Sequence, residues 1–250
     1  MSCRRATAEC AGLTRRTPQS LTMLARLRDG VWKWPDGLLW RLTEPLTIRS
    51  REVKLQLFLQ EIGADPRLRV LDVGGGADDV RGGNYFERHY PYREQVVTCV
   101  YGSGAELAAF RRLHPGIRVV AGDGRCLPFR NDAFDVALSN AVIEHVGEQE
   151  QQRAFLSELV RVARRVFLAT PNRWFPVDTH TLIPLAHYFP PCVRFPVYRC
   201  LGRGYWASLD HLNLLSATQL RDLMPPGLRC KLVRLRLLGL AHSLVLVLRK

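Results

Sequence analysis

The sequence predicts an α/β fold in which a parallel sheet is covered by helices on both faces. Three observations lead to this prediction. Short, continuously apolar runs such as 96–100 alternate with segments of helical periodicity along the chain. One such run, 70–73, leads directly into a glycine-rich turn. At 250 residues and 47% hydrophobic composition, the chain can bury a full core as a single domain with additions.

The expected elements are given in chain order. Residues 1–48 are expected to form an N-terminal extension, whose aromatic cluster 31–40 either packs against the domain or covers a substrate mouth. A domain follows over 49–250 and opens with a helix over 53–62, which stops at the Gly63-Ala64-Asp65-Pro66 run. The periodicity then predicts strands near 69–73, 96–101, 117–121, 134–138 and 165–170, and helices near 78–90, 104–112 and 148–163.

The last third of the chain begins with an irregular stretch. Residues 173–215 mix aromatics, prolines and arginines, and we interpret them as a substrate lid. A satellite core under a loop and a segment that docks on a membrane interface are the alternatives. Ser216 and Gln219 form a capping box that opens a short helix. The runs 229–237 and 242–249 then predict a closing hairpin.

The segment Val70–Asp79 (VLDVGGGADD) is the most informative part of the chain. Glycines at 74 and 76 let the backbone take positive φ and approach a ligand closely, although a plain strand-to-helix turn is the alternative. A dinucleotide loop requires a third glycine, where this chain has Asp79. A carboxylate there would repel a pyrophosphate, whereas S-adenosylmethionine is cationic and has no phosphate. The turn therefore favours S-adenosylmethionine as the cofactor.

Further motifs follow in a characteristic order: GDG at 122–124, LPF at 127–129, FDVALSN at 134–140 and EH at 144–145. Together with the turn at 70–79, this order resembles the class I S-adenosylmethionine-dependent methyltransferases over about residues 50–172. The resemblance implies a Rossmann-like, doubly wound sheet of seven strands with an antiparallel last strand. In this fold, 173–215 is an insertion before the sixth strand.

The resemblance also implies roles for single residues. Asp72, Gly74 and Gly76 would line the methionine and ribose portion of the cofactor. Asp123 would accept a hydrogen bond from the adenine amino group, although a simple turn aspartate is the alternative. Gly124 would offer a backbone N–H to the ring, and Asn140 would stand between cofactor and acceptor.

Two positions depart from the family pattern. The family usually ends its loop with a further glycine, where this chain has Asp78. The family places an acidic residue after the second strand to hold both ribose hydroxyls, and this chain has Tyr101 there. Tyr101 can stack on the ribose or hydrogen-bond to it, but it cannot supply a bidentate carboxylate. A non-catalytic binding or scaffold protein on the same fold is therefore an alternative function. A nicotinamide-dependent oxidoreductase is a third hypothesis, against which the missing third glycine argues.

Methyl transfer to a hydroxyl benefits from a general base, for which histidine is suited. His180 is the preferred base, with Asp178 as the partner that orients it. His145 is the second candidate, and a structural hydrogen bond at a helix start is its alternative role. Glu144 is expected either near the sulfonium or simply exposed. These residues predict a methyltransferase for a small-molecule or lipid-like acceptor.

Composition limits the partners that are expected. The formal charge is +13, from 36 basic and 23 acidic residues, but the arginines are scattered, so nucleic-acid binding is not expected. Seven cysteines without a C-x-x-C pair predict no metal site, and Cys99 and Cys230 are expected to be buried. No apolar run reaches membrane-spanning length, so a cytoplasmic protein is expected, with peripheral membrane contact as a further expectation.

Overall fold

The computed structural model describes residues 38–76, 83–102 and 104–250, and the side chains from residue 44 onward in the first of these ranges. Residues 1–37 of the predicted N-terminal extension lie outside the described residues, as do residues 78–82 of the predicted helix 78–90. The helices are α3 (Leu38–Glu61), α4 (Tyr85–His89), α5 (Gly104–Leu113), α6 (Gln149–Val162), α7 (Pro191–Cys200) and α8 (Ala217–Asp222). The strands are β1 (Val70–Val73), β2 (Val96–Val100), β3 (Arg118–Ala121), β4 (Phe134–Asn140), β5 (Ala163–Pro171), β6 (Arg229–Leu237) and β7 (Leu240–Arg249).

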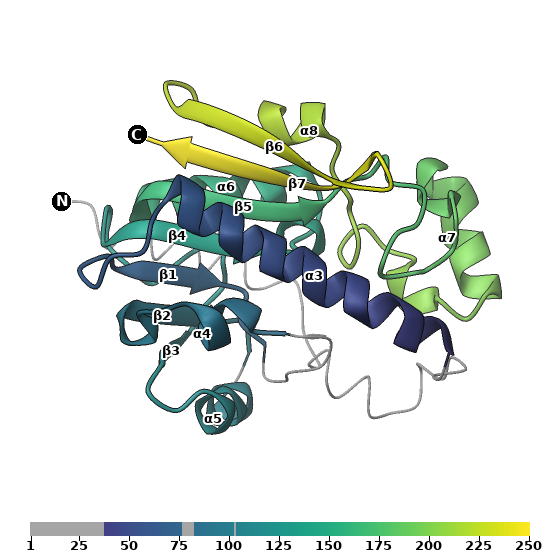
Figure 1. Ribbon diagram of the computed structural model, residues 1–250. Helices are drawn as coiled ribbons and strands as arrows, with labels where there is room; N and C mark the ends of the chain where they lie inside the picture. The colour runs from purple at the N-terminus through teal and green to yellow at the C-terminus, as the bar shows by residue number, and fades with distance from the viewer. Residues whose placement is uncertain (1–37, 77–82, 103) are drawn as a thin grey trace. The chain divides into compact units, whose positions relative to one another are not determined.

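The seven strands form one sheet in the order β3-β2-β1-β4-β5-β7-β6 (Figure 1). Strands β1 to β5 pair in parallel, and β7 runs antiparallel to both β5 and β6. The α/β prediction, with seven strands, an antiparallel last strand and an insertion before the sixth strand, is confirmed. The carboxyl ends of β1 to β4 consequently meet at one edge, where a doubly wound sheet binds its ligands.

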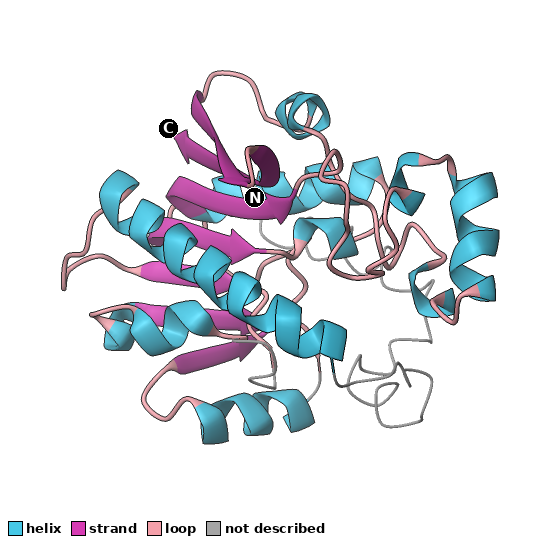
Figure 2. Ribbon diagram, turned by 45° about the vertical axis from the view of Figure 1, so that its right-hand side comes forward, coloured by secondary structure: helices cyan, strands magenta, loops and turns pink. Residues whose placement is uncertain are grey.

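Each face of the sheet has its own apolar core. On one face, Leu71 and Val73 pack with Phe155 and Leu159 of α6 and Leu220 of α8. On the other face, alternate strand residues pack with α3, α4 and α5, as in the cluster of Val70, Phe58, Phe86 and Phe110. The period-2 alternation of strand side chains therefore explains both layers of helices (Figure 2).

Local signals set several element boundaries. Ser216 Oγ accepts a hydrogen bond from the Gln219 backbone N–H, and Gln219 Oε1 accepts one from the Ser216 backbone N–H, so the capping box forms as predicted. The helix before β1 begins at Leu38 rather than near residue 53, and Pro45 lies inside it. The predicted domain boundary at 48/49 therefore falls within α3.

Two of the cysteines differ in exposure. Cys99 is buried in the central strand β2, as predicted, whereas Cys230 is exposed, so the prediction of burial was wrong there. Cys230 lies on the edge strand β6, where an apolar run does not require burial on both faces.

The insertion 173–215 follows β5 and contains α7. The parallel strands point their carboxyl ends toward the side of the molecule on which α7 lies (Figures 1 and 2). The two ends of the insertion are joined where Arg173 N–H donates to Leu215 O, and the preceding residue, Asn172, donates its N–H to His242 O of β7. It therefore lies beyond the edge at which the predicted site residues gather.

Candidate functional site

The loop after β1 is fixed by packing that only glycine permits. Gly74 has φ +111°, and a Cβ atom on it would lie 2.2 Å from Val142 Cγ2. A Cβ atom on Gly75 would lie 2.2 Å from Thr98 Cγ2. Gly76 is held by Asn84, which accepts from its N–H at 2.8 Å and donates to its carbonyl at 3.0 Å. The loop backbone is therefore held against β2 and the segment after β4.

Asp72 forms a carboxyl pair beneath this loop. It is 7% exposed and hydrogen-bonds with the side chain of Glu87 from α4, which is 1% exposed. Thr98 Oγ1 donates a further hydrogen bond to Glu87 at 3.3 Å. Burial raises the pKa of Asp72 well above its usual range, and the neighbouring Glu87 adds to this shift. Such a pair is stabilised by a nearby cation and repels a phosphate.

Asp123 follows β3 at the same edge, as predicted. Both of its carboxylate oxygens accept from the Arg125 guanidinium, at 2.6 to 3.1 Å, and Oδ1 also accepts from the Arg125 backbone N–H. A Cβ atom on Gly124 would lie 2.4 Å from Phe155, so this turn also excludes a side chain. The ion pair orients the carboxylate and leaves it capacity for another donor.

Tyr101 lies directly after β2 with 60% of its surface exposed. The parallel pairing of β2 with β1 and β3 places it at the same edge as the glycine loop and Asp123. Its exposed ring is available to a ligand at the position where the family has a carboxylate. Hydrogen bonding or stacking by Tyr101 stays a prediction.

Asn140 ends β4 and contacts a residue that the sequence analysis missed. Its Oδ1 accepts from Lys54 Nζ of α3 at 3.0 Å. Burial is the main cause that lowers the pKa of Lys54 to about 8. The positive charge of Arg51 lowers it as well, whereas the charge of Glu144 opposes the shift. The next residue, Ala141, has φ +58°, a rare conformation for a residue other than glycine. Lys54 lies in a helical run with no motif around it, so only the folded structure reveals this contact.

The two candidate bases lie side by side although 35 residues separate them in the sequence. The rings of His145 and His180 pack edge to face with centroids 4.7 Å apart, and Trp206 contacts both. His180 Nδ1 is 2.7 Å from Asp178 Oδ1, which confirms the predicted partnership. Asp178 is 4% exposed, and the charge and hydrogen bond of His180 lower its pKa in spite of burial.

These bonds determine which ring nitrogen can accept a proton. His145 Nδ1 lies 2.7 Å from His211 O, so it carries the proton that it donates to this carbonyl. Burial, with the neighbouring His180, lowers the pKa of His145 and favours the neutral ring. In a neutral His180, Nδ1 donates to Asp178 and Nε2 is the proton acceptor. This arrangement is that of a general base oriented by a carboxylate.

Glu144 is fully buried rather than exposed. Its Oε2 accepts from Thr170 Oγ1 at 2.9 Å, and its Oε1 lacks a hydrogen-bond partner among the described residues. Glu144, His145 and His180 each offer one ligand atom within 4.8 Å of the others, so they could hold a divalent metal. Local spacing in the sequence predicted no metal site, and the fold brings these three residues together from separate segments.

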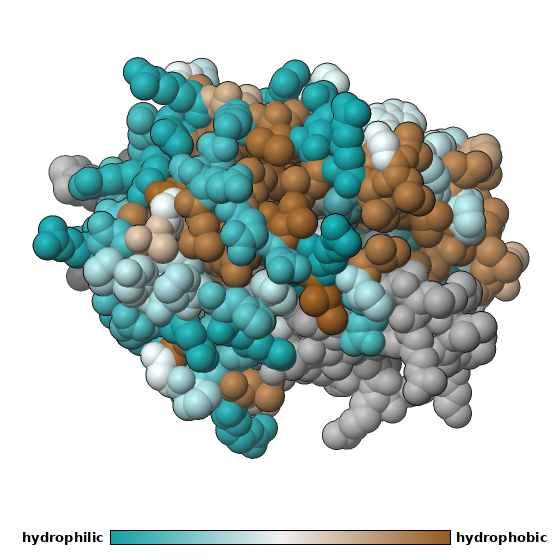
Figure 3. Space-filling view, in the orientation of Figure 1, coloured by the Kyte–Doolittle hydropathy of each residue, from teal (hydrophilic) through white to brown (hydrophobic). Residues whose placement is uncertain are grey.

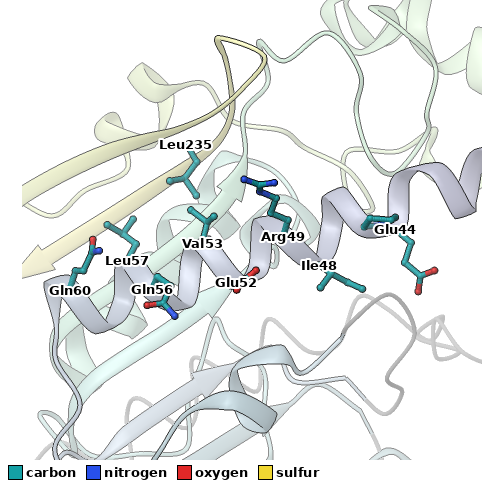
Figure 4. A pocket seen from close by; sticks show the side chains of 10 residues that line it. Glu44, Ile48, Arg49, Glu52, Val53, Gln56, Leu57, Gln60 and Leu235 are labelled. Atoms are coloured by element: carbon teal, nitrogen blue, oxygen red, sulfur yellow. The ribbon is translucent and has the colours of Figure 1, made fainter.

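A groove of about 860 Å³ runs along the outer side of α3 (Figure 4). It is lined by residues of α3 and one of β6: Glu44, Pro45, Ile48, Arg49, Glu52, Val53, Gln56, Leu57, Gln60 and Leu235. None of the site residues above lines it. Its lining mixes charged, polar and apolar side chains, and it includes neither His145, His180 nor Asp178.

Known proteins show the same domain. Residues 71–166 match the family model described as a methyltransferase domain. A demethylmenaquinone methyltransferase from Renibacterium salmoninarum is 30% identical over 109 residues, which cover 44% of this chain and 42% of that protein. The match thus spans less than half the length of that relative.

Solved structures share the fold at lower identity. The PH0226 protein from Pyrococcus horikoshii has a TM-score of 0.54 at 16% identity, covering 80% of this chain and 90% of that one. Magnesium protoporphyrin IX methyltransferase from Synechocystis, solved with bound S-adenosylhomocysteine, has a TM-score of 0.53 at 15% identity, covering 91% and 94%.

Residues 71–166 therefore match a methyltransferase domain, on a fold shared with a solved methyltransferase that binds S-adenosylhomocysteine, and S-adenosylmethionine is the cofactor that these comparisons support. The donor set fits this cation, because the carboxyl pair at Asp72 and the carboxylate of Asp123 lie at the edge where it would bind. The matched domain contains every predicted cofactor residue and His145, whereas His180 lies beyond it.

Gly74→Ala tests the packing of the loop. We expect it to lower the free energy of unfolding by about 1–3 kcal/mol, because the new Cβ atom must displace Val142, and to weaken S-adenosylhomocysteine binding. Gly227→Ala is the control, since Gly227 also has positive φ but nothing lies within 4 Å of its Cβ position. Urea denaturation and calorimetric titration measure both effects, and equal effects in the two variants would contradict the packing argument.

Lys54→Met tests the buried ammonium. Because the folded-state pKa of about 8 lies below the usual 10.5, the unfolded chain holds more protons between these values. The free energy of unfolding of the wild type should therefore rise, relative to Lys54→Met, as the pH increases from 8 to 10. Denaturant unfolding at each pH measures this difference, and a flat difference would show that Lys54 titrates normally.

Proposed function

We propose that this protein transfers the methyl group of S-adenosylmethionine to a hydroxyl-bearing small-molecule or lipid-like acceptor, with His180 as the general base. The observation that carries the proposal is the Asp178–His180–His145 cluster beyond the carboxyl ends of β4 and β5. Bound S-adenosylmethionine supplies an electrophilic methyl group on a sulfonium. The chain itself must hold the acceptor in line and accept its proton.

In this proposal the cofactor is held along the edge of the sheet. Asp123 accepts from the adenine amino group, Tyr101 contacts the ribose, and the glycine loop with Asp72 meets the methionine portion. Gly124 contributes a backbone N–H. Asn140 separates this part of the site from the acceptor. These groups come from the ends of β1, β2, β3 and β4 or from the loops that follow them, which lie at one edge of the sheet.

The proton transfer follows from the tautomer of His180. Nε2 of His180 would accept the hydroxyl proton of the acceptor as its oxygen is methylated, and S-adenosylmethionine would supply the methyl group and leave as a neutral thioether. Asp178, hydrogen-bonded to Nδ1, stabilises the imidazolium that forms. His145 packs against the ring of His180 from the side, and its lowered pKa makes it a weak proton acceptor.

The acceptor class rests on the surroundings and on the relatives. Trp206 packs against both histidines, which gives the acceptor side an aromatic wall. The two similar methyltransferases act, by their names, on demethylmenaquinone and on magnesium protoporphyrin IX, which are small molecules. A screen with radiolabelled S-adenosylmethionine and demethylmenaquinol, porphyrin and simple phenol acceptors tests this proposal.

The alternative is a binding protein without activity, for which the tyrosine at position 101 is the specific observation. The two functions make different predictions in the screen. Binding of S-adenosylhomocysteine without methylation of any acceptor would favour the binding protein. Absence of binding would contradict both.

Asp123→Ala tests the adenine contact. Loss of a hydrogen bond to a buried polar group should weaken S-adenosylhomocysteine binding by about 1–3 kcal/mol. Arg125→Met is the matched variant, because it removes the ion pair and keeps the carboxylate. Calorimetric titration should show a much smaller loss for Arg125→Met. Equal losses would mean that Asp123 only holds Arg125.

His180→Ala tests the base. Turnover should fall by about 10²–10⁴-fold while S-adenosylhomocysteine affinity stays near normal, because the base acts on the acceptor proton. His242→Ala is the control, since this half-buried histidine contacts Ser50 rather than the cluster. Retained turnover in His180→Ala would refute the assignment. Turnover that a chelator abolishes would instead favour a metal held by Glu144, His145 and His180.

A further inference from the structure

Helix α7 buries polar side chains and exposes apolar ones. Its buried residues are Arg194 and Tyr198, whereas Val193 and Val197 are 45% and 37% exposed. The buried guanidinium of Arg194 donates to His187 O at 3.4 Å and lies over the Phe195 ring. An ordinary surface helix places its apolar side chains in the core. The valines of α7 are therefore not held by the core of this chain.

Helix α6 shows the ordinary arrangement in the same molecule. Phe155 and Leu159 are buried there, and Glu150 and Arg153 are exposed. The difference cannot come from overall composition, because both helices belong to the same strongly charged chain. It is a property of the insertion.

The exposed apolar surface extends beyond α7. Phe189, Leu201, Leu185 and Trp174 are 53%, 51%, 48% and 57% exposed. With Val193 and Val197 they define what we call the α7 face. Among the exposed residues of 184–202, Arg199 is the only charged one. In the space-filling view, apolar atoms gather on the side where Figure 1 places α7 (Figure 3).

Charge indicates which partner would cover this face. No Asp or Glu occurs between residues 179 and 209, and the whole chain carries a formal charge of +13. Two copies of the chain would bring like charges together, including Arg199 on each face. An anionic surface would instead be attracted, and an apolar interior below it would accommodate the valines, Phe189 and Leu201.

Trp174 is suited to the border of such a contact. It is exposed, Arg173 lies over its ring at 5.7 Å, and its carbonyl accepts from the Tyr188 hydroxyl at 2.8 Å. Tryptophan and tyrosine are enriched where an apolar layer meets water. No helix among the described residues is long and apolar enough to cross a bilayer, so the contact in question is at the surface.

We propose that the α7 face docks on the surface of an anionic lipid bilayer. Arg203 ties this face to the base, because its backbone N–H donates to Tyr198 O of α7 and its Nε donates to Thr181 O beside His180. Docking would therefore bring the acceptor side of the site to the lipid. That a lipid-soluble acceptor enters from the bilayer rests on the proposed function, whereas docking itself does not.

Vesicle flotation tests the docking. Wild-type protein is mixed with vesicles of phosphatidylcholine alone or with added phosphatidylglycerol, at low and high salt. Val193→Asp/Val197→Asp should reduce the fraction bound to anionic vesicles by about tenfold or more. Leu238→Asp/Leu240→Asp is the matched control, since it adds the same charge at two exposed leucines of the β6–β7 turn, and it should bind like the wild type.

The outcomes separate the explanations. Wild type that does not bind anionic vesicles, or equal loss in both double variants, would overturn the proposal. Concentration-dependent dimers that Val193→Asp/Val197→Asp abolishes, measured by light scattering, would show that the face binds a second copy and would also overturn it. S-adenosylhomocysteine affinity is measured on the same proteins. If the protein does not bind S-adenosylhomocysteine, the proposed function is refuted, whereas the result of the vesicle experiment still stands.

Discussion

The buried carboxylate of Glu144 is the constraint on which the site depends. Its Oε2 accepts from Thr170 at the end of β5, and its backbone carbonyl accepts from the Asn213 N–H in the insertion. The adjacent His145 donates to His211 O. Three segments distant in sequence are thereby joined at the end of β4. A fully buried carboxylate is costly unless it is compensated, so this junction is a defined arrangement rather than a loose loop.

The placement of acidic groups adds an electrostatic feature. The chain is strongly basic, yet the buried carboxylates of its described part, Asp72, Glu87, Glu144 and Asp178, all belong to the site or to the residues that support it. Asp72 and Glu87 share a hydrogen bond, and burial keeps the charge of the ionised carboxylates from being screened by solvent. A cationic cofactor therefore meets a locally acidic environment inside a protein whose surface attracts anions. The two kinds of partner are attracted to different parts of the molecule.

Much of the fold could be predicted because its signals are local. Strands such as β2 are continuous apolar runs, the glycine turn requires positive φ at Gly74, and the capping box at Ser216 needs only four residues. The motif order in 70–145 extended these signals to the sheet topology. The start of α3 was missed because Pro45 within a helix contradicts local propensity.

The acceptor side could be predicted only in part. His180 and Asp178 were linked by their spacing of two residues, but the approach of His145 and Glu144 depends on the path of the insertion. Lys54 reaches Asn140 across 86 positions, and no local pattern indicates such a contact. The aromatic content of 173–215 favoured a lid, with a satellite core and a membrane contact as alternatives, and the exposure of α7 is the observation that supports the membrane contact.

The most direct test is a crystal structure with S-adenosylhomocysteine bound. The account predicts adenine against Asp123, the ribose beside Tyr101, and the sulfur at the end of β4 with Asn140, facing His180. A product molecule bound elsewhere, or one whose sulfur faces away from the His145–His180 pair, would contradict the assignment of this edge as a joint cofactor and acceptor site.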